Sequence, residues 1–438
     1  MKYFSSLILA FSPILVHALT LTDVVQETIL THPQMKVKEE ILREKEQELV
    51  NVKSGYLPTI DLSYSIGPEV TRTITNNQNR ASLTRKDATV TLKQNLFSGF
   101  DTMNGVKQKK ELILSASENV NETANSLAIE SINAYLSVLK YSALYKTAQE
   151  NVALHTKYLN QIKKTVEGGI GINSNYTQTL SRFENVTSEE YLAKLEYLNI
   201  VSSYQRVLPG KVFVEELEEP TLGQLKYKNL DLLIKDCIEN NPIIKGLKSE
   251  INASKALVAR NKSKYYPTVD LVAQSYWNKN LNGISTNNEA PLSSSNYDSE
   301  SGYNALVVFK YNIFNGLVDK SNIEMSKYKL LQNHNSLSDN ERILKLNIEI
   351  AWNTYHITEK SLEHIKNDIL ATFETVAYYQ KEYELGRRSL IDLLNVSIEY
   401  NNAKKRKINA EFEHLLAYYK ILSYSNKLLS EMHVSIGN

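Results

Sequence analysis

The sequence contains few residues that crosslink a chain or interrupt regular structure. Its 438 residues include one cysteine, Cys237, which excludes an intramolecular disulfide and a metal site built from several cysteines. Only 15 glycines and 9 prolines occur, which favours long uninterrupted helices. The formal net charge is +1, so the composition does not indicate a nucleic-acid partner. Beyond the N-terminal region no 18 consecutive residues are apolar, which excludes a transmembrane helix there.

The N-terminal residues 1–18 have the pattern of a secretory signal peptide. Lys2 supplies a positive charge, an apolar segment follows, and Val16-His17-Ala18 resembles a cleavage site. An uncleaved membrane anchor is the alternative, but the apolar run is short and Pro13 interrupts it. We therefore expect the chain to be exported.

Two stretches of similar length, residues 100–167 and 317–383, have the pattern of coiled-coil helices. Apolar or small residues recur at alternating three- and four-residue steps, which predicts a helix with one narrow apolar seam. About 65 residues form a rod of roughly 100 Å, and one seam cannot be buried without partner helices. The seam residues of the first stretch are Ile113, Ala116, Val120, Leu127, Ala134, Val138, Tyr141, Tyr145, Ala148, Val152, Leu159, Ile162 and Val166.

The motifs along the chain occur twice in the same order, which predicts a tandem duplication. The offset between the copies is 209 residues before the first strand and 217 residues after the second strand, so eight extra residues fall between the strands. Insertions confined to a loop are what a shared scaffold tolerates. The matching pairs are His32-Pro33 with Asn241-Pro242, residues 56–62 with 265–271, residues 93–99 with 310–316, Gly169 with Gly386, and Asn175 with Asp392.

We therefore predict a mainly α-helical chain with a small β part, in two tandem repeats joined by an acidic connector. Residues 68–87 and 278–302 are polar and are expected to form exposed loops between strands. The predicted boundaries are 19–206 for the first repeat, with a hairpin at 59–97, a long helix at 100–167 and a return helix at 174–206; 207–230 for the connector; and 231–438 for the second repeat, with a hairpin at 268–314, a long helix at 317–383 and a return helix at 389–433.

The four predicted strands per chain have one apolar face and one polar face. Asp61, Lys93, Asp270 and Lys310 are placed on the polar face, where they would meet a watery lumen. Four strands cannot close a barrel, and an open edge is not tolerated in lipid. The strands are therefore expected to combine with those of sister chains. A soluble pair of hairpins that caps a helical bundle is the alternative.

This duplicated order resembles the TolC family of outer-membrane channels over essentially the whole mature chain. The motifs that carry the resemblance are Tyr-x-Pro-Thr-x-Asp-Leu at the start of a strand and Asn-Leu-Phe-Ser-Gly or Asn-Ile-Phe-Asn-Gly at a strand end. The resemblance implies a homotrimer with one shared twelve-stranded transmembrane β-barrel and an α-helical periplasmic tunnel. It also implies a periplasmic adaptor and an inner-membrane transporter as partners.

The family resemblance also assigns a periplasmic gate to the turn before the last helix. Tyr383, Gly386, Arg388, Ser389 and Asp392 match the family pattern Tyr-x-x-Gly-x-Arg-[Ser/Thr]-x-x-Asp. The family implies a ring of Asp392 at the constriction, which would concentrate negative charge and attract cations. A surface carboxylate at a helix start is the alternative for Asp392, and a surface cation is the alternative for Arg388.

This sequence departs from the family pattern at two further gate positions. Asn395 stands where the family has a second acidic residue, and Asn175, beside Ser174, stands where the family places an acidic partner for arginine. A neutral amide binds a guanidinium less tightly than a carboxylate does. We therefore predict a gate held by weaker hydrogen bonds. The glycines Gly168, Gly169, Gly171 and Gly386 mark the helix turns, which are the expected tips for adaptor docking.

No motif in the sequence predicts catalysis, a cofactor or a metal site, so we do not expect an enzyme. Gly168-Gly169-Ile170-Gly171 lacks the strand and the Lys-Ser/Thr of a phosphate-binding loop. The leading hypothesis is a passive exit duct in the outer membrane of a Gram-negative bacterium, serving type I protein secretion with an ABC transporter. The alternatives are a channel for efflux of small molecules and a periplasmic coiled-coil rod without a pore.

Overall fold

The computed structural model describes residues 20–72, 80–208, 217–280 and 299–436. The predicted signal peptide, the tips of both β-hairpins and part of the connector therefore lie outside the described residues. The chain forms two compact units. One unit comprises Glu39–Glu118 and Lys245–Asp339 and is called here the sheet unit, because it contains the four strands. The rest of the chain is called the hairpin unit, because it contains the two turns that join long helices. Each unit contains segments of both sequence repeats, so a repeat is not itself a compact unit.

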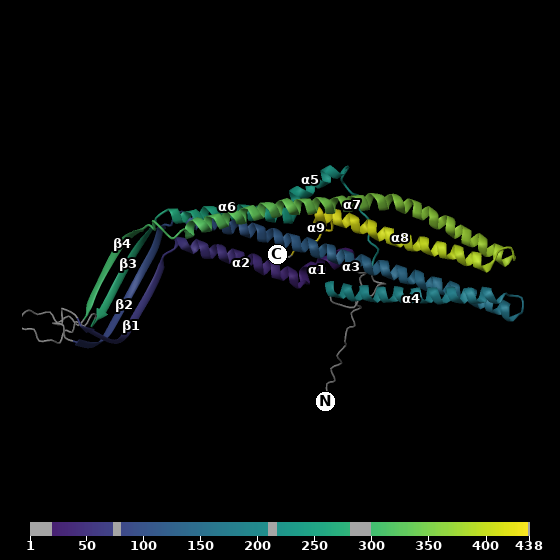
Figure 1. Ribbon diagram of the computed structural model, residues 1–438, viewed down its shortest axis with the longest axis horizontal. Coiled ribbons are helices and arrows are strands. Elements are labelled where there is room, and N and C mark those ends of the chain that lie inside the picture. Colours follow the sequence, from purple (N-terminus) through teal and green to yellow (C-terminus); the bar gives the residue numbers. More distant parts are fainter. Residues whose placement is uncertain (1–19, 73–79, 209–216, 281–298, 437–438) are drawn as a thin grey trace, which may run out of the picture. The chain divides into compact units, whose positions relative to one another are not determined.

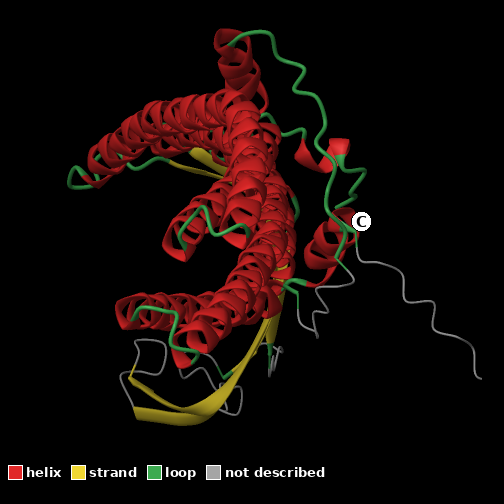
Figure 2. Cartoon of the chain, turned by 90° about the vertical axis from the view of Figure 1, so that its right-hand side faces the viewer, coloured by secondary structure: helices red, strands yellow, loops and turns green. Residues whose placement is uncertain are grey.

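The element order confirms a mainly helical chain in which one series of elements occurs twice (Figures 1 and 2). Each repeat has two helices that meet at a proline, two strands, one long helix and one return helix. The first repeat contains α1 Leu21–Thr31, α2 Pro33–Lys53, β1 Thr59–Arg72, β2 Arg80–Phe97, α3 Asp101–Glu167 and α4 Asn173–Val207. The second contains α5 Leu230–Asn240, α6 Pro242–Asn261, β3 Thr268–Lys279, β4 Glu300–Lys310, α7 Val318–Glu384, α8 Leu390–Tyr424 and α9 Leu428–Glu431.

Three predicted boundaries were wrong. The expected loop at 68–87 is largely strand, because β1 continues to Arg72 and β2 begins at Arg80. The second hairpin ends at Lys310 rather than 314. The return helix predicted to reach 433 ends at Tyr424. There Asn426 adopts a φ of 56°, and Lys427 N–H donates to Leu422 O at 2.8 Å, so the chain leaves the helix before α9 begins.

The four strands form one antiparallel sheet in the order β1-β2-β3-β4. The pairing register places Asp61, Lys93, Asp270 and Lys310 on one face, as predicted. Lys93 Nζ lies 3.2 Å from Asp270 Oδ2, so two of these charges form a cross-strand ion pair. The opposite face carries exposed apolar side chains. They include Ile60, Leu62, Tyr64 and Ile66 of β1 and Tyr303, Val307 and Phe309 of β4.

The turn from the sheet into α3 requires glycine at position 99. Gly99 has a φ of 63°, and a Cβ atom there would lie 2.3 Å from the carbonyl oxygen of Ser263. Two residues later Asp101 begins α3 and accepts a hydrogen bond from Arg260 Nε of α6 at 3.2 Å. Within the sheet unit the chain therefore turns sharply at Gly99, and the charged contact between Arg260 and Asp101 fixes the start of α3.

The long helices match their predicted limits within one residue. Helices α3 and α7 contain 67 residues each, and α4 and α8 contain 35 residues each. In the hairpin unit the predicted seam residues Leu127, Val138 and Ala148 of α3 are at most 4% exposed. Among the described residues, the helices lack a segment long and apolar enough to cross a membrane.

Candidate functional site at the tips of the helical hairpins

Both helical hairpins of the hairpin unit turn through the same backbone motif. Gly169 follows α3 with a φ of 76°, and Gly386 follows α7 with a φ of 72°. In the first turn Ile170 N–H donates to Thr165 O at 3.2 Å, and in the second Arg387 N–H donates to Glu382 O at 2.8 Å. These bonds define a glycine-terminated helix end, in which the left-handed glycine turns the chain so that the N–H of the next residue binds one of the last carbonyl groups of the helix.

The other two tip glycines have different structural roles. A Cβ atom on Gly171 would lie 2.7 Å from Val166 Cγ2, so the turn leaves no room for a side chain. Gly168 is exposed and donates its N–H to Lys164 O at 3.0 Å. The turn geometry explains Gly169, Gly171 and Gly386 without any partner, and a role for these glycines in adaptor docking stays a prediction.

Asp392 binds the start of its own helix. Ser389 is the N-cap of α8, and its hydroxyl accepts the Asp392 N–H at 3.1 Å and donates to Asp392 Oδ2 at 2.8 Å. A carboxylate in the first turn of a helix is also favoured by the helix dipole. These contacts hold Asp392 at a fixed place beside the tip, half-buried in a single chain. Its place in a constriction stays a prediction.

Arg388 is held by groups of its own hairpin. Its Nε donates to Glu382 Oε2 at 2.9 Å, and its guanidinium lies 4.1 Å from the centroid of the Tyr379 ring. The hydrogen bond from Glu382 raises the pKa of Arg388. Glu382 precedes the turn and Arg388 follows it, so this ion pair closes the α7–α8 turn. Neither Glu382 nor Tyr379 was predicted from the sequence as a partner of Arg388.

The remaining predicted gate residues have separate local partners. Asn175 donates its N–H to Ile172 O at 3.1 Å and accepts the Thr179 hydroxyl with its carbonyl at 2.7 Å. Ser174 and Asn395 are exposed. Among the described hydrogen bonds, none joins Asn175 to Arg388. The weak cross-hairpin bond predicted from the sequence is therefore absent within this chain, and a bond between chains stays a prediction.

An apolar cluster, called here the tip cluster, packs the two hairpins together near their turns. Tyr383 is half-buried against this cluster, as are Leu154, Tyr176 of α4, and Val376 and Tyr379 of α7. Leu393 and Leu394, which follow Asp392, are fully buried. The residues of the tip cluster are Tyr158 and Ile162 of α3 and Leu390, Leu393, Leu394 and Val396 of α8.

His155 is buried on α3, one turn before the tip cluster, without a hydrogen bond to either ring nitrogen. Burial lowers the pKa of His155 below its usual 6.5; Arg182 of α4 acts in the same direction, and Glu189 opposes it. Glu189 is itself bound by Lys405 of α8 at 3.1 Å. The neutral imidazole is therefore the form that this packing accepts.

We expect the hairpin unit to lose stability as the pH falls below about 6.5, and His155→Leu to reduce that loss. The unfolded chain binds a proton at His155 near pH 6.5, whereas the folded chain does not. Acid therefore favours unfolding by up to about 1.4 kcal/mol per pH unit for this group. Urea unfolding between pH 7.5 and 5 measures the slope. Burial also lowers the pKa of His414, which therefore adds a pH dependence of the same sign to the wild-type chain and to His155→Leu.

The matched control for this pH dependence is His364→Leu. His364 is an exposed histidine of α7 within the hairpin unit, so its replacement removes an imidazole without altering buried packing, and the slope of unfolding free energy against pH should equal that of the wild-type chain. An identical slope for the wild-type chain and His155→Leu would show that His155 is not buried as a neutral group.

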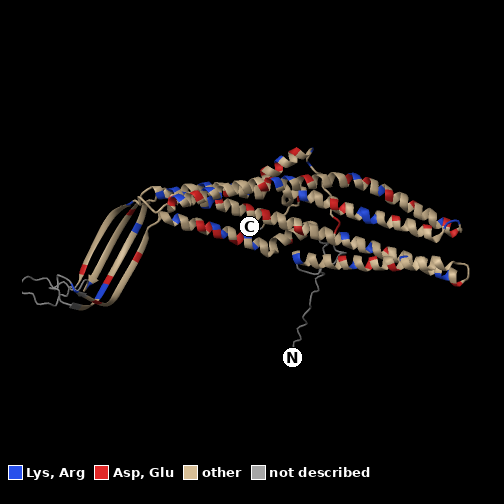
Figure 3. Cartoon of the chain, viewed as in Figure 1, with Lys and Arg blue, Asp and Glu red and all other residues tan. Residues whose placement is uncertain are grey.

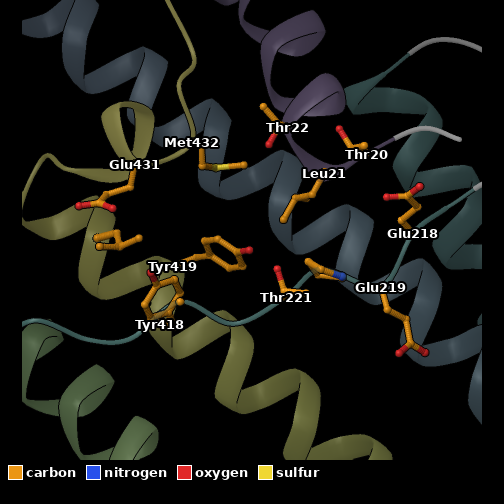
Figure 4. A pocket seen from close by; sticks show the side chains of 13 residues that line it. Thr20, Leu21, Thr22, Glu218, Glu219, Thr221, Tyr418, Tyr419, Glu431 and Met432 are labelled. Carbon is orange, nitrogen blue, oxygen red and sulfur yellow. The ribbon is translucent and has the colours of Figure 1, made fainter. Parts of the chain in front are cut away.

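A separate cavity lies elsewhere in the hairpin unit and contains none of the predicted gate residues. Its volume is about 440 Å³, and its lining comes from the start of α1, the connector, the end of α8 and α9 (Figure 4). Tyr418, Tyr419 and Met432 line it together with Thr20 and Thr221. Glu431 at its edge is bound to Lys226 at 2.6 Å.

Basic and acidic residues are interspersed along the helices (Figure 3). Several of them pair between the two hairpins. Lys404 Nζ lies 2.7 Å from Glu150, and Lys405 Nζ lies 3.1 Å from Glu189. Both pairs are partly exposed, and such pairs contribute at most about 1 kcal/mol each.

Comparisons with known proteins give one consistent result. The model of the family described as outer membrane efflux protein matches residues 24–208 and 233–423. The chain is 20% identical to the outer membrane protein TolC of Escherichia coli over 429 residues, covering 95% of this chain and 84% of that protein. It is 19% identical to the outer membrane efflux protein BepC of Brucella suis over 394 residues, covering 89% of this chain and 81% of that protein.

Solved structures of channel proteins share the fold. The outer-membrane channel OprN superposes with a TM-score of 0.80 at 14% identity, covering 93% of this chain and 90% of that chain. The CmeC outer membrane channel of Campylobacter jejuni gives a TM-score of 0.80 at 12% identity, covering 93% of this chain and 86% of that chain.

Proposed function

Since the chain belongs to the outer membrane efflux protein family, we propose that it is the passive exit duct of a tripartite type I secretion system. The protein is located in the outer membrane. Three copies form one barrel and one periplasmic tunnel. An inner-membrane ABC transporter supplies the energy, a periplasmic adaptor connects the two, and an unfolded secreted protein is the cargo.

The main observation that supports this proposal is the open sheet. Its edge strands β1 and β4 each have one neighbour within the described chain, and one sheet face carries exposed apolar side chains. Backbone groups at an open edge cannot be left unpaired in lipid. Three chains with four strands each give twelve strands, which is enough to close a barrel around a watery lumen. The ion pair between Lys93 and Asp270 then lies on the lumen face.

Exposed side chains at the tips of the helical hairpins are evidence for the proposed adaptor. Three apolar side chains at the two turns are exposed in the chain: Ile170 at 85%, Ile172 at 64% and Leu385 at 69%. Exposed apolar side chains at a helix turn are available for contact with another protein. An adaptor that covers them would join the tunnel to the inner-membrane transporter.

The cargo assignment rests on sequence motifs around the second strand. Leu83-Thr84-Arg85 and Gln94-Asn95-Leu96-Phe97-Ser98-Gly99 are similar to those of channels that serve type I secretion. Efflux of small toxic compounds is the second candidate, because the matching family and the relative BepC are both described as efflux proteins.

The test is deletion of the gene, followed by complementation with the full chain. Under the type I proposal, the deletion strain retains its secreted protein in the cell and keeps its resistance to detergents and dyes. Under the efflux candidate, resistance falls while secretion is unchanged. Heat-modifiable trimers in the outer-membrane fraction are expected in either case. A soluble periplasmic monomer would overturn the channel proposal and support a rod without a pore.

A further inference from the structure

The two β-hairpins of the sheet unit pair their strands in the same register. Thr59 lies opposite Lys93 in the first hairpin, and Thr268 lies opposite Lys310 in the second. These pairs are related by the offsets of the duplication, which are 209 residues from β1 to β3 and 217 residues from β2 to β4. Each strand residue of one hairpin therefore has a structural equivalent in the other.

The two hairpins meet where β2 pairs with β3, which is called here the inner junction. The strands equivalent to β2 and β3 are β4 and β1, and these lie at the two edges of the sheet (Figure 1). Three strand spacings separate the edges by roughly 14 Å, so β4 and β1 of one chain do not meet. A second junction of the same kind, the outer junction, requires β1 of another chain.

The end of β2 depends on the inner junction. Residues 94–97 pair with β3, whereas the pairing of β2 with β1 stops at Lys93. The equivalent residues 311–314 follow β4 and are not strand, and all four are exposed. Ile313 and Phe314 are 88% and 76% exposed. This segment therefore has the sequence of a strand end and lacks the strand that would pair with it.

A polar contact accompanies the inner junction. Asp270 Oδ1 accepts a hydrogen bond from Asn95 Nδ2 at 2.8 Å, and Asp270 Oδ2 lies 3.2 Å from Lys93 Nζ. The equivalent residues at the sheet edges are Asp61, Asn312 and Lys310. Their side chains are exposed and have no hydrogen bond or ion pair within the described part of the chain. The same carboxylate, amide and amine are thus present at the edges without their contacts.

The corner after the strand is also incomplete at the edge. Gly99 is packed so closely that a Cβ atom would lie 2.3 Å from the carbonyl oxygen of Ser263. Gly316, its equivalent, has a φ of 55°, but no atom lies within 4 Å of its Cβ position. The equivalent of Ser263 is Ser54, which is exposed after α2, whereas Ser263 is 3% exposed. Gly316 and Ser54 are therefore two halves of a contact that one chain does not make.

One charged contact of the inner junction has no equivalent at the edges. Arg260 binds Asp101 there, and the equivalent positions are Asn51 and Val318. The charged contact that the edges can repeat is therefore the one centred on Asp61.

We propose that β4 of each chain pairs with β1 of the next in the register of the inner junction, so that Lys310 and Asn312 bind Asp61 of the neighbouring chain. Residues 311–314 extend β4 in this outer junction, and Gly316 packs against Ser54 of the neighbouring chain. The inference rests on the proposed channel function, which requires three chains to close one barrel. It adds which residues meet and which polar contact joins them.

The register is tested by disulfide formation between full-length chains in outer-membrane fractions. Thr91 lies opposite Gln274 at the inner junction, so Val308 should lie opposite Ser65 of the neighbouring chain. Cysteines whose Cα atoms are about 4.4–6.8 Å apart can form a disulfide. We expect Val308→Cys combined with Ser65→Cys to give a covalent trimer on heated, non-reducing electrophoresis.

The matched control is Val308→Cys combined with Ser63→Cys. Ser63 is on the same face of β1, two residues from Ser65, and such a diagonal neighbour is about 7–8 Å away, beyond the reach of a disulfide. This variant and each single-cysteine variant should be mainly monomeric after heating. Cys237 is buried and is kept in all variants. Unheated, reduced samples show whether each variant assembles.

The polar contact is tested by Asp61→Asn and Lys310→Gln. One partly exposed ion pair corresponds to up to about a five-fold change in an equilibrium constant, and a trimer would contain three. We expect each change to raise the monomer fraction after mild heating about five-fold, and the double variant to raise it no further. Lys93→Gln is the matched control, because its ion pair with Asp270 lies within one chain. Its monomer fraction should stay close to that of the wild-type chain.

The outcomes distinguish failure of the outer junction from failure of the channel proposal. A wild-type chain that forms no trimer would overturn both. An assembled trimer that crosslinks through Ser63 instead of Ser65, or through neither, would overturn the register alone. Additive effects of Asp61→Asn and Lys310→Gln would overturn the polar contact, and so would an equal loss of trimer in Lys93→Gln.

Discussion

Val307→Arg should reduce the amount of folded trimer in the outer membrane by at least tenfold. Val307 lies on the apolar face of the edge strand β4 and is 68% exposed in a single chain. Arginine on the lipid face of a barrel costs about 2–4 kcal/mol near the bilayer midplane, and a trimer would carry three copies of the change. Electrophoresis of unheated outer-membrane fractions measures the trimer.

The matched control is Leu306→Arg on the same strand. The register places Leu306 on the opposite face, which carries Asp270 and Lys310, so an arginine there would meet water in the proposed lumen. We expect this variant to retain most of its trimer. Equal losses in the two variants, or no loss in either, would contradict the assignment of the apolar face to lipid.

Leu393→Ala should open the tip cluster and increase local unfolding at the start of α8. Leu393 is fully buried between Tyr158 and Ile162 of α3 and the neighbouring residues of α8. Truncation of a buried leucine typically costs about 2–5 kcal/mol, because it removes contacts and leaves a cavity. Amide hydrogen exchange in the first turns of α8 reports this local opening directly.

Leu385→Ala provides the comparison, since Leu385 is 69% exposed at the neighbouring turn. Surface truncations usually change stability by less than about 0.5 kcal/mol, so its exchange rates should stay close to those of the wild-type chain. If the two leucine variants exchange at the same rate, the tip cluster does not hold the hairpins together.

The helical part of the fold was largely predictable from the sequence. The limits of α3 and α7 follow from an unbroken apolar seam between two glycine-containing turns, and both features depend on local sequence. The matched dipeptides His32-Pro33 and Asn241-Pro242 lie at the break between α1 and α2 and at the break between α5 and α6. Duplication strengthened each prediction because every element was seen twice.

The strand limits were harder to predict because one face of each strand is polar. Arg85 in the expected loop instead belongs to β2, where it lies 3.3 Å from Glu69 of β1. Pro68 also belongs to β1, which is an edge strand within this chain, and an edge strand tolerates proline because it can leave one N–H unpaired. Charged residues and a proline therefore concealed strand residues that pair across the sheet.

The partner of Arg388 could not be predicted from the family pattern. That pattern directs attention to Asn175 on the facing hairpin, whereas the chain offers Glu382 six residues before the arginine. A tight turn brings these two residues together, and the choice depends on the backbone geometry at Gly386. The hydrogen bond from the Tyr158 hydroxyl of α3 to Gln380 Oε1 of α7 joins residues 222 positions apart, so only the packed helices reveal it.

In both helical hairpins the long arm has 67 residues and the return arm has 35 residues. This equality limits how the chain can change in length. Adding one turn to both arms of a single hairpin would advance its tip by about 5.4 Å past the other. Tyr158 would then face a different residue, and the rim presented to the proposed adaptor would become uneven. Lengthening or shortening the conduit therefore requires the same change in both halves of the chain. A natural or engineered variant with a different reach should carry its insertions in matched pairs, separated by about half the sequence.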